Sequence, residues 1–142
     1  MREILFRGKR FDNGEWETGS LLVERMNTSD QQEMIADKMT GYPTLVLPET
    51  IGQYTGLTDK NGVRIFEGDV IRGRSVYIGG HSTSNRALVI YKAGMFLLSF
   101  GESEEECTAA QDVEFLGAWH GSVEIIGNIH DNPELLEADK NE

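Results

Sequence analysis

The chain has 142 residues and a formal net charge of −11; 16 residues are glycine and only one, Cys107, is cysteine. The length suffices for one domain with a hydrophobic core, a lone cysteine excludes an intrachain disulfide, and no apolar run reaches the roughly 20 residues of a membrane span. Residues 1–20 also lack the apolar segment of a secretory signal, so we expect a cytoplasmic protein. Abundant glycine favours a turn-rich β protein over a helical one.

The negative charge is concentrated in the last part of the chain. Residues 1–101 hold 12 acidic and 12 basic residues, whereas residues 102–142 hold 12 acidic residues and a single basic one, Lys140. This distribution argues against broad electrostatic binding to nucleic acid, while it leaves room for a basic patch in the first two-thirds.

The N-terminal segment predicts a β-hairpin. Residues 2–7 form a short apolar run, and Asp12-Asn13-Gly14 is typical of a tight hairpin turn, because Asn and Gly tolerate positive φ angles. The aromatic residues on either side of this turn, Phe11 and Trp16, are expected to pair across the two strands. The second strand would continue to residue 24 after a kink at Gly19.

The next segment is less informative. Residues 32–38 are compatible with a strand or with one helical turn, because the apolar pattern does not separate the two. Residues 44–47 are β-branched and apolar, and the following Pro48 ends the strand or places it at a sheet edge.

The middle of the chain carries the strongest turn signals. Two short apolar arms, residues 51–57 and 63–66, flank Asp59-Lys60-Asn61-Gly62, which fits a type I turn closed by a Gly bulge. Gly68 bends the chain again, and Val70 begins the next strand.

The second half predicts more strands and one helix. Residues 87–91 and 95–100 are near-continuous apolar runs and should be central strands of a hairpin. Residues 113–119 and 122–129 are the last strand candidates. Asn132-Pro133-Glu134 is typical of a helix start, since Asn is a favoured N-cap and Pro a favoured first helical residue.

These elements predict a mainly β fold. We expect a compact sandwich or partly open barrel, with an SH3-like barrel portion in the second half, an N-terminal hairpin and a short C-terminal helix. The expected parts of this single domain, 1–142, are a hairpin and sheet part (about 1–50), a barrel part (about 51–130) and the helix (about 133–138). The structures of residues 25–44 and 101–112 stay open.

Three blocks of sequence form a recognisable pattern. They are Met1-Arg2-Glu3-Ile4 with Phe6-Arg7-Gly8-Lys9; Gln53-Tyr54-Thr55-Gly56-Leu57 with Asp59-Lys60-Asn61-Gly62 and Phe66-Glu67-Gly68-Asp69-Val70-Ile71; and Ile126-Gly127-Asn128-Ile129-His130 with Asn132-Pro133-Glu134-Leu135-Leu136. In content and order these blocks resemble the YopX family, small proteins encoded by bacteriophages and prophages. The resemblance reaches from end to end, although residues 25–44 and 72–120 carry no matching motif. It implies a mainly β fold and an intracellular phage or prophage context, and it implies no catalytic residue.

Ligand-like motifs are better interpreted as structural. Asp59-x-Asn61-Gly62 resembles the start of a calcium loop, but the twelfth position, which needs Glu, would be Val70. Glu67 and Asp69 form a carboxylate pair suited to acid–base chemistry, yet beside Gly68 they are expected to accept backbone N–H bonds.

Metal-ligating residues are scattered. His81, His120 and His130 show no ligand spacing, and Cys107 has no Cys or His partner nearby in the sequence. We therefore predict no catalytic residue, no metal site and no cofactor.

Two charged regions are the remaining candidate sites. Arg72, Arg74, Tyr77 and Arg86 interleave basic and aromatic residues near a Gly-rich loop, which suits contact with phosphate; the alternative is a solvated strand face. Glu104, Glu105 and Glu106 begin an acidic excursion that would suit a protein interaction or an imitation of DNA; the alternative is an acidic surface that only aids solubility.

The first hypothesis is a non-enzymatic phage or prophage accessory protein that acts as an interaction or assembly module, with a protein partner, self-association or both. The alternatives are nucleic-acid binding through the basic strand face and acidic mimicry of DNA that occupies a host DNA-binding protein. No membrane partner is expected.

Overall fold

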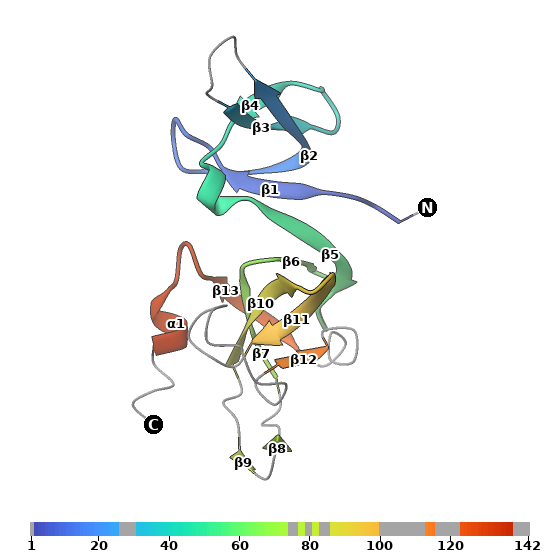
Figure 1. Cartoon of the computed structure of the whole chain (residues 1–142), viewed down its shortest axis with the longest axis vertical. Coiled ribbons are helices and arrows are strands. Elements are labelled where there is room, and N and C mark those ends of the chain that lie inside the picture. Colours follow the sequence, from blue (N-terminus) through green and yellow to red (C-terminus); the bar gives the residue numbers. More distant parts are fainter. Residues whose placement is uncertain are drawn as a thin grey trace. The chain divides into compact units, whose positions relative to one another are not determined.

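The computed structural model describes residues 2–25, 31–73, 77–78, 81–82, 86–99, 113–115 and 123–137 (Figure 1). The chain divides into two compact units, residues 1–56 and residues 57–142. The boundary falls within one strand, β5.

The first unit is built on four short antiparallel strands. They are β1 (Phe6–Lys9), β2 (Trp16–Arg25), β3 (Gln31–Asp37) and β4 (Pro43–Leu45), followed by a 3-10 turn, η1 (Pro48–Thr50), and β5 (Gly52–Thr58). Together with β6 (Arg64–Phe66) of the second unit, these strands form a sheet in the order β4-β3-β2-β1-β5-β6. The chain after β4 also returns to the end of β1, where the Leu47 N–H donates to the Lys9 carbonyl at 2.8 Å. The sheet therefore curls around the buried side chains of Ile35 and Val46.

The predicted N-terminal hairpin is confirmed, with a different register. Trp16 lies opposite Lys9 in the β1–β2 pair, so the expected pairing of Trp16 with Phe11 is wrong. Phe11 lies in the turn with its side chain 71% exposed, and its N–H donates to the Leu45 carbonyl at 3.0 Å. Phe11 thus lies next to β4 rather than opposite Trp16.

The ambiguous segment at residues 32–38 is a strand, β3, which pairs with β2 from Gly19↔Asp37 to Arg25↔Gln31. Gly19 permits this pairing, because a Cβ there would lie 1.9 Å from the Ala36 carbonyl oxygen. The strand β2 runs through Gly19 without interruption.

The second unit contains a five-stranded antiparallel sheet in the order β12-β11-β10-β7-β13. Its elements are β6 (Arg64–Phe66), β7 (Asp69–Arg72), β8 (Tyr77–Ile78), β9 (His81–Ser82), β10 (Arg86–Lys92), β11 (Met95–Ser99), β12 (Val113–Phe115), β13 (Glu124–Asn128) and α1 (Glu134–Glu137). The predicted hairpin between β10 and β11 is confirmed. Its two turn residues, Ala93 and Gly94, have φ angles of 54° and 78°, as a type I′ turn requires.

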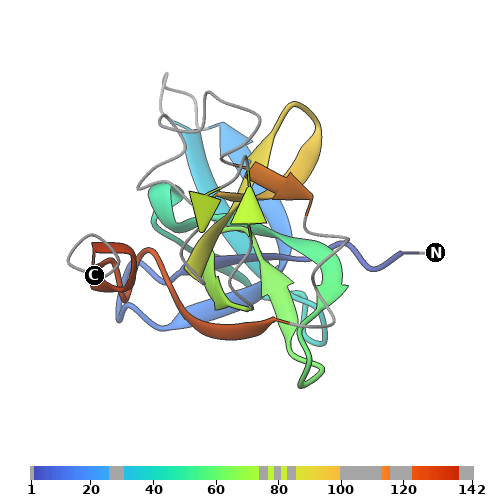
Figure 2. The same ribbon diagram turned by 90° about the horizontal axis from the view of Figure 1, so that it is seen from below.

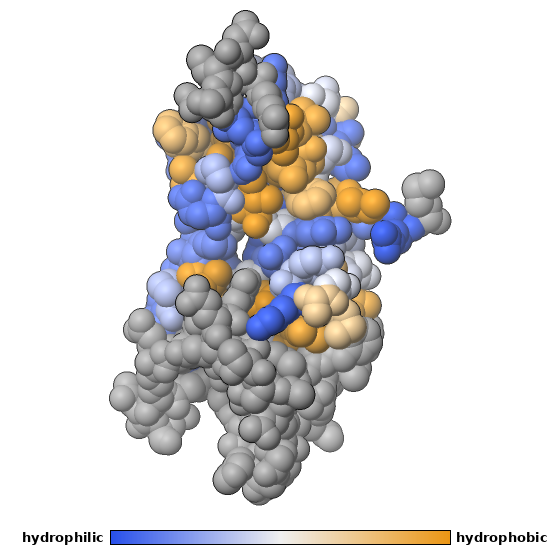
Figure 3. Space-filling model, viewed as in Figure 1, coloured by the Kyte–Doolittle hydropathy of each residue, from blue (hydrophilic) through white to orange (hydrophobic). Residues whose placement is uncertain are grey.

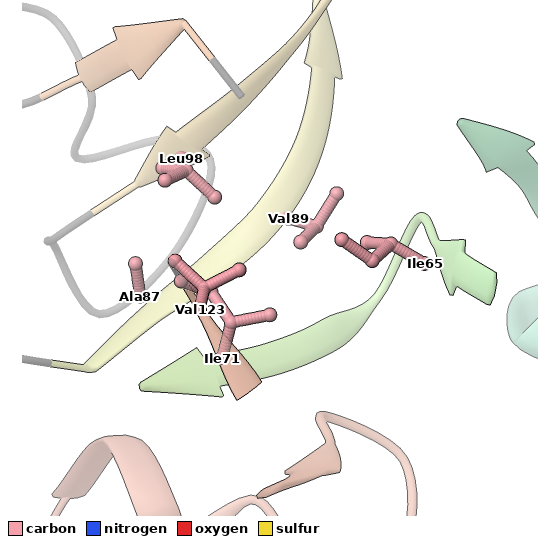
Figure 4. Packing of buried hydrophobic residues seen from close by; sticks show 6 residues of the cluster. All are labelled: Ile65, Ile71, Ala87, Val89, Leu98 and Val123. Atoms are coloured by element: carbon pink, nitrogen blue, oxygen red, sulfur yellow. The ribbon is translucent and has the colours of Figure 1, made fainter. Parts of the chain in front are cut away.

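Both faces of this sheet are buried. One core consists of Ile65, Ile71, Ala87, Val89, Leu98 and Val123, whose side chains converge in Figure 4. The other consists of Val70, Leu88, Ile90 and Leu97, with Leu135 of α1 packed against it. Figure 2 shows α1 (red) at the end of the segment that follows β13. Burial on both faces explains why the β10 and β11 sequences are continuously apolar rather than alternating.

The mainly β fold, the N-terminal hairpin and the short C-terminal helix are confirmed. Among the described residues the five-stranded sheet is open, since β12 and β13 are its two edges. The SH3-like character of this portion stays a prediction. The expected change from a sheet part to a barrel part near residue 50 also stays a prediction. The predicted excursion at residues 101–112 lies outside the described residues.

Candidate functional site

The turn after β5 is a structural element built on the carboxylate of Asp59. Its Oδ1 accepts the N–H groups of Asn61 and Val63, both at 2.9 Å, and its Oδ2 accepts the N–H of Ile125 in β13 at 3.2 Å. Burial alone would raise the pKa of this carboxyl, but the three backbone donors and Lys60 hold the pKa below its usual value. Asp59 therefore closes its own turn and attaches that turn to β13, as the structural interpretation expected.

The second bend uses a buried carboxylate in the same way. Asp69 Oδ2 accepts the Phe66 N–H at 2.7 Å. Gly68 has a φ of +93°, donates its N–H to the Val89 carbonyl, and accepts the Ile129 N–H. This bend thereby joins β10 to the segment after β13. The geometry assigns Asp69 to the backbone rather than to acid–base chemistry.

The predicted basic face is partly assembled. Arg72 and Arg86 are directly opposite each other in the β7–β10 pair, so their side chains share a face. Arg86 Nη1 donates to the Leu135 carbonyl at 3.1 Å and thus binds the terminal helix. Arg74 lies outside the described residues; Tyr77 is in β8, and the structure describes only its backbone.

Arg72 faces an acidic partner that the sequence did not reveal. Its Nη2 lies 3.4 Å from Glu124 Oε2, and Lys60 Nζ lies 3.8 Å from the same oxygen. This cluster carries one net positive charge, and both cations already have a carboxylate beside them. Arg72 and Lys60 are therefore expected to bind phosphate less strongly than unpaired cations would.

The other predicted site residues lie outside the described residues. This applies to Glu104, Glu105 and Glu106, and likewise to His120 and Cys107. Within the described ranges no group of three His, Cys, Asp or Glu residues is placed to hold a metal ion. The N–H of His130 donates to Asn128 Oδ1 at 3.0 Å, in the turn that precedes α1.

Cations also gather on the first unit, around Trp16. The Arg7 guanidinium carbon lies 4.7 Å from the centre of the indole ring, and the Lys9 ammonium lies 5.7 Å from it. Cation–π contacts are favourable even on partly exposed rings. These two contacts therefore stabilise the β1–β2 pairing in which Lys9 lies opposite Trp16.

Sequence reasoning missed a pocket of about 340 Å³ in the first unit. It lies between the β1–β2 turn and the β3–β4 hairpin, and its lining residues are Arg10, Phe11, Asp12, Met34, Tyr42, Pro43, Thr44 and Leu45. Tyr42 is 73% exposed and Leu45 is 43% exposed. The sequence did contain one signal for this pocket: an aromatic residue stands beside turn residues both in Phe11-Asp12 and in Gly41-Tyr42-Pro43.

One side of the pocket is polar and charge-compensated. Arg10 binds Asp12 through two contacts, Nε to Oδ1 at 3.0 Å and Nη2 to Oδ2 at 2.9 Å. The hydrogen bond with Asp12 raises the pKa of Arg10, and the same hydrogen bond lowers the pKa of Asp12. Both groups stay charged at neutral pH, so neither is suited to transfer a proton there.

The apolar side of the pocket continues along the outer face of the sheet. Leu22, Met34 and Leu45 are opposite one another on β2, β3 and β4, and therefore form one row. Figure 3 shows hydrophobic surface (orange) over these strands. Contiguous exposed apolar surface is more common at binding sites than elsewhere on soluble proteins.

Comparison with known proteins shows the family. The YopX family (YopX protein) matches residues 5–137. Protein EF1440 from Enterococcus faecalis, known from a crystal structure, is 26% identical; the match covers 96% of this chain and 99% of that one, with a TM-score of 0.52. No curated protein matches the chain, and no helix in the described residues is long and apolar enough to cross a membrane. The sequence match over nearly the whole length places this chain in the YopX family.

Proposed function

We propose that this YopX-family protein is a non-enzymatic accessory protein that acts by binding another protein. It would work in the cytoplasm of a bacterial host, in a phage or prophage context. The observation that carries the proposal is the pocket of the first unit with its exposed apolar rim.

The pocket has the chemistry of a protein-binding site. Its volume of about 340 Å³ is at the lower end of the range for ligand pockets and leaves room for a side chain of a partner. Phe11 and Tyr42 stand at its rim with most of their surface in water, and such aromatic residues often contribute most of the binding free energy at an interface. The Arg10–Asp12 ion pair is already formed, so it supplies polar contacts at the edge without a buried charge.

The nucleic-acid alternative has less support. Of the residues proposed to contact phosphate, Arg86 is engaged with a helix carbonyl and Arg72 lies beside Glu124. The DNA-mimic alternative depends on Glu104 to Glu106, outside the described residues. Nothing in the protein-binding proposal depends on the SH3-like character of the second unit.

A site-specific photo-crosslinking experiment tests the proposal. A crosslinking amino acid at Tyr42 should capture a host or phage protein in infected cells, whereas the same group at Tyr91, a half-exposed residue of the second unit, should not. With the captured protein purified, Phe11→Ala and Tyr42→Ala should each weaken binding by about tenfold or more, since a truncated anchor typically costs 1.4 kcal/mol or more.

The control is Met39→Ala, because Met39 is fully exposed and does not line the pocket. Its affinity should equal that of the wild type. Equal capture at Tyr42 and Tyr91, or unchanged affinity in both aromatic variants, would contradict the proposal.

A further inference from the structure

The strand β2 extends beyond its neighbour β1. It runs from Trp16 to Arg25, but β1 covers only the stretch from Trp16 to Gly19. From Ser20 onward, β2 pairs within the described residues with β3 alone. The outer edge of this stretch therefore presents backbone N–H and C=O groups that no described strand occupies. The β2–β3 ribbon is visible in Figure 1 above β1.

Within the described residues, the stretch Ser20–Val23 of this edge carries none of the charges or prolines that protect many natural sheet edges. The sequence Ser20-Leu21-Leu22-Val23 has no proline, lysine or glycine, and its first charged residue is Glu24. Adjacent residues point to opposite faces, yet Leu22 is 41% exposed and Val23 is 51% exposed. Unprotected, apolar edge strands are templates for pairing with another strand.

We infer that a second copy of this chain pairs antiparallel with β2 along this edge, with Leu22 opposite Leu22 of the copy. In this register Leu21 is opposite Val23 and Ser20 is opposite Glu24, so apolar residues meet apolar residues. Moving the centre to Val23 would place Leu22 opposite Glu24 instead. The segment Ser20–Glu24 is thus complementary to itself, which is what a twofold interface requires.

The intramolecular register supports the same choice. Leu22 already forms a row with Met34 and Leu45 on β3 and β4. Pairing at Leu22 continues this apolar row across the twofold axis into the same row of the second copy. The segment proposed to pair also begins at Ser20, directly after Gly19, the last residue of β2 that pairs with β1.

A short edge-to-edge interface is small, so the dimer should be weak, with a dissociation constant in the micromolar range or above. Sedimentation of the full-length protein at about 100 µM should show a mass above the 15.9 kDa of one chain, moving toward twice that value with concentration.

Charge exchange at the axis tests the register. Leu22→Lys and Leu22→Glu should each sediment as monomers, because like charges directly opposite each other are destabilising. A mixture of the two variants should recover dimers that native mass spectrometry identifies as one copy of each. Met39→Lys, on the same unit and almost fully exposed, should dimerise like the wild type.

Circular dichroism of each monomeric variant checks that the variant is still folded, so that loss of the dimer is not caused by unfolding. The inference is overturned if the wild type sediments at 15.9 kDa at every concentration. It is also overturned if the single Leu22 variants stay dimeric or if their mixture stays monomeric. None of these outcomes depends on Phe11 or Tyr42, so they are distinguishable from failure of the pocket to bind a partner.

Discussion

Replacing Asp59 with alanine should destabilise the second unit strongly. The side chain is only 6% exposed, and its two oxygens accept three backbone N–H groups, two within the turn and one from Ile125 in β13. Alanine removes all three hydrogen bonds at once. The Lys60 N–H, which donates to the Val123 carbonyl at 2.9 Å, then becomes the main remaining backbone link between the turn and the segment that leads into β13.

The expected cost follows from the number of lost bonds. A hydrogen bond to a charged acceptor contributes about 1.5 kcal/mol or more, and a longer bond such as that from Ile125 contributes less. Because water can reach part of the vacated turn, we expect a loss of about 3–5 kcal/mol in the free energy of unfolding. For a chain of this size that corresponds to a fall of roughly 10–15 °C in Tm.

Asp59→Asn should cost less, about 2–3 kcal/mol, because the amide keeps one acceptor oxygen and places a donor against the other N–H groups. Urea unfolding and thermal unfolding followed by circular dichroism measure both variants. Asp12→Ala is the matched control, since Asp12 is largely exposed and its ion pair with Arg10 lies at the surface; its stability should equal that of the wild type.

The pH dependence checks the same reasoning. The pKa of Asp59 is lower in the folded state than its usual value, so its charged form stabilises the fold fully above the unfolded pKa of about 4. This contribution disappears as the pH falls through the folded pKa. The stability gap between wild type and Asp59→Asn should therefore be widest near pH 7 and should narrow below about pH 4. A gap that does not change with pH, or a loss under about 1 kcal/mol for Asp59→Ala, would refute the assignment.

Three further substitutions test other parts of the fold. Gly19→Ala should destabilise the first unit by more than about 2 kcal/mol, because its Cβ would lie 1.9 Å from a backbone oxygen; a Tm equal to that of the wild type would contradict this close approach. Arg86→Ala should speed amide hydrogen exchange in α1, because it removes the donor to the Leu135 carbonyl, whereas Lys92→Ala on the same strand should not. Ala93→Asn should stabilise the protein by about 0.5–1 kcal/mol, since Asn tolerates the positive φ of 54° better than Ala; chemical denaturation measures the gain, and a loss would argue against the type I′ turn.

Local signals in the sequence predicted most of the elements. Asn61-Gly62 and Ala93-Gly94 mark turns in which Gly62, Ala93 and Gly94 have positive φ angles, and the tolerance of glycine for such angles is a property of the residue itself. The apolar runs of β10 and β11 likewise predicted buried strands. The failure at Phe11 and Trp16 arose because Trp16 lies opposite Lys9, two residues before Phe11, and a small difference in hairpin register changes every cross-strand pair.

The candidate site was less accessible to prediction because its parts are distant in the chain. Arg72 and Arg86 lie opposite each other on the paired strands β7 and β10, but Glu124 and Leu135, their partners, are 52 and 49 residues away. The pocket of the first unit likewise joins the β1–β2 turn to the β3–β4 hairpin. No periodic pattern in the sequence connects these segments.

Turn chemistry and apolar periodicity act over a few residues, which is why the β class, the hairpins, the terminal helix and the family pattern were already evident in the chain. Strand order, the curl of the first sheet and the length by which β2 exceeds β1 depend on which distant segments bury each other's apolar side chains. Those long-range contacts alone determined that Asp59 also binds the Ile125 N–H of β13, and that exposed apolar surface lies on the first unit.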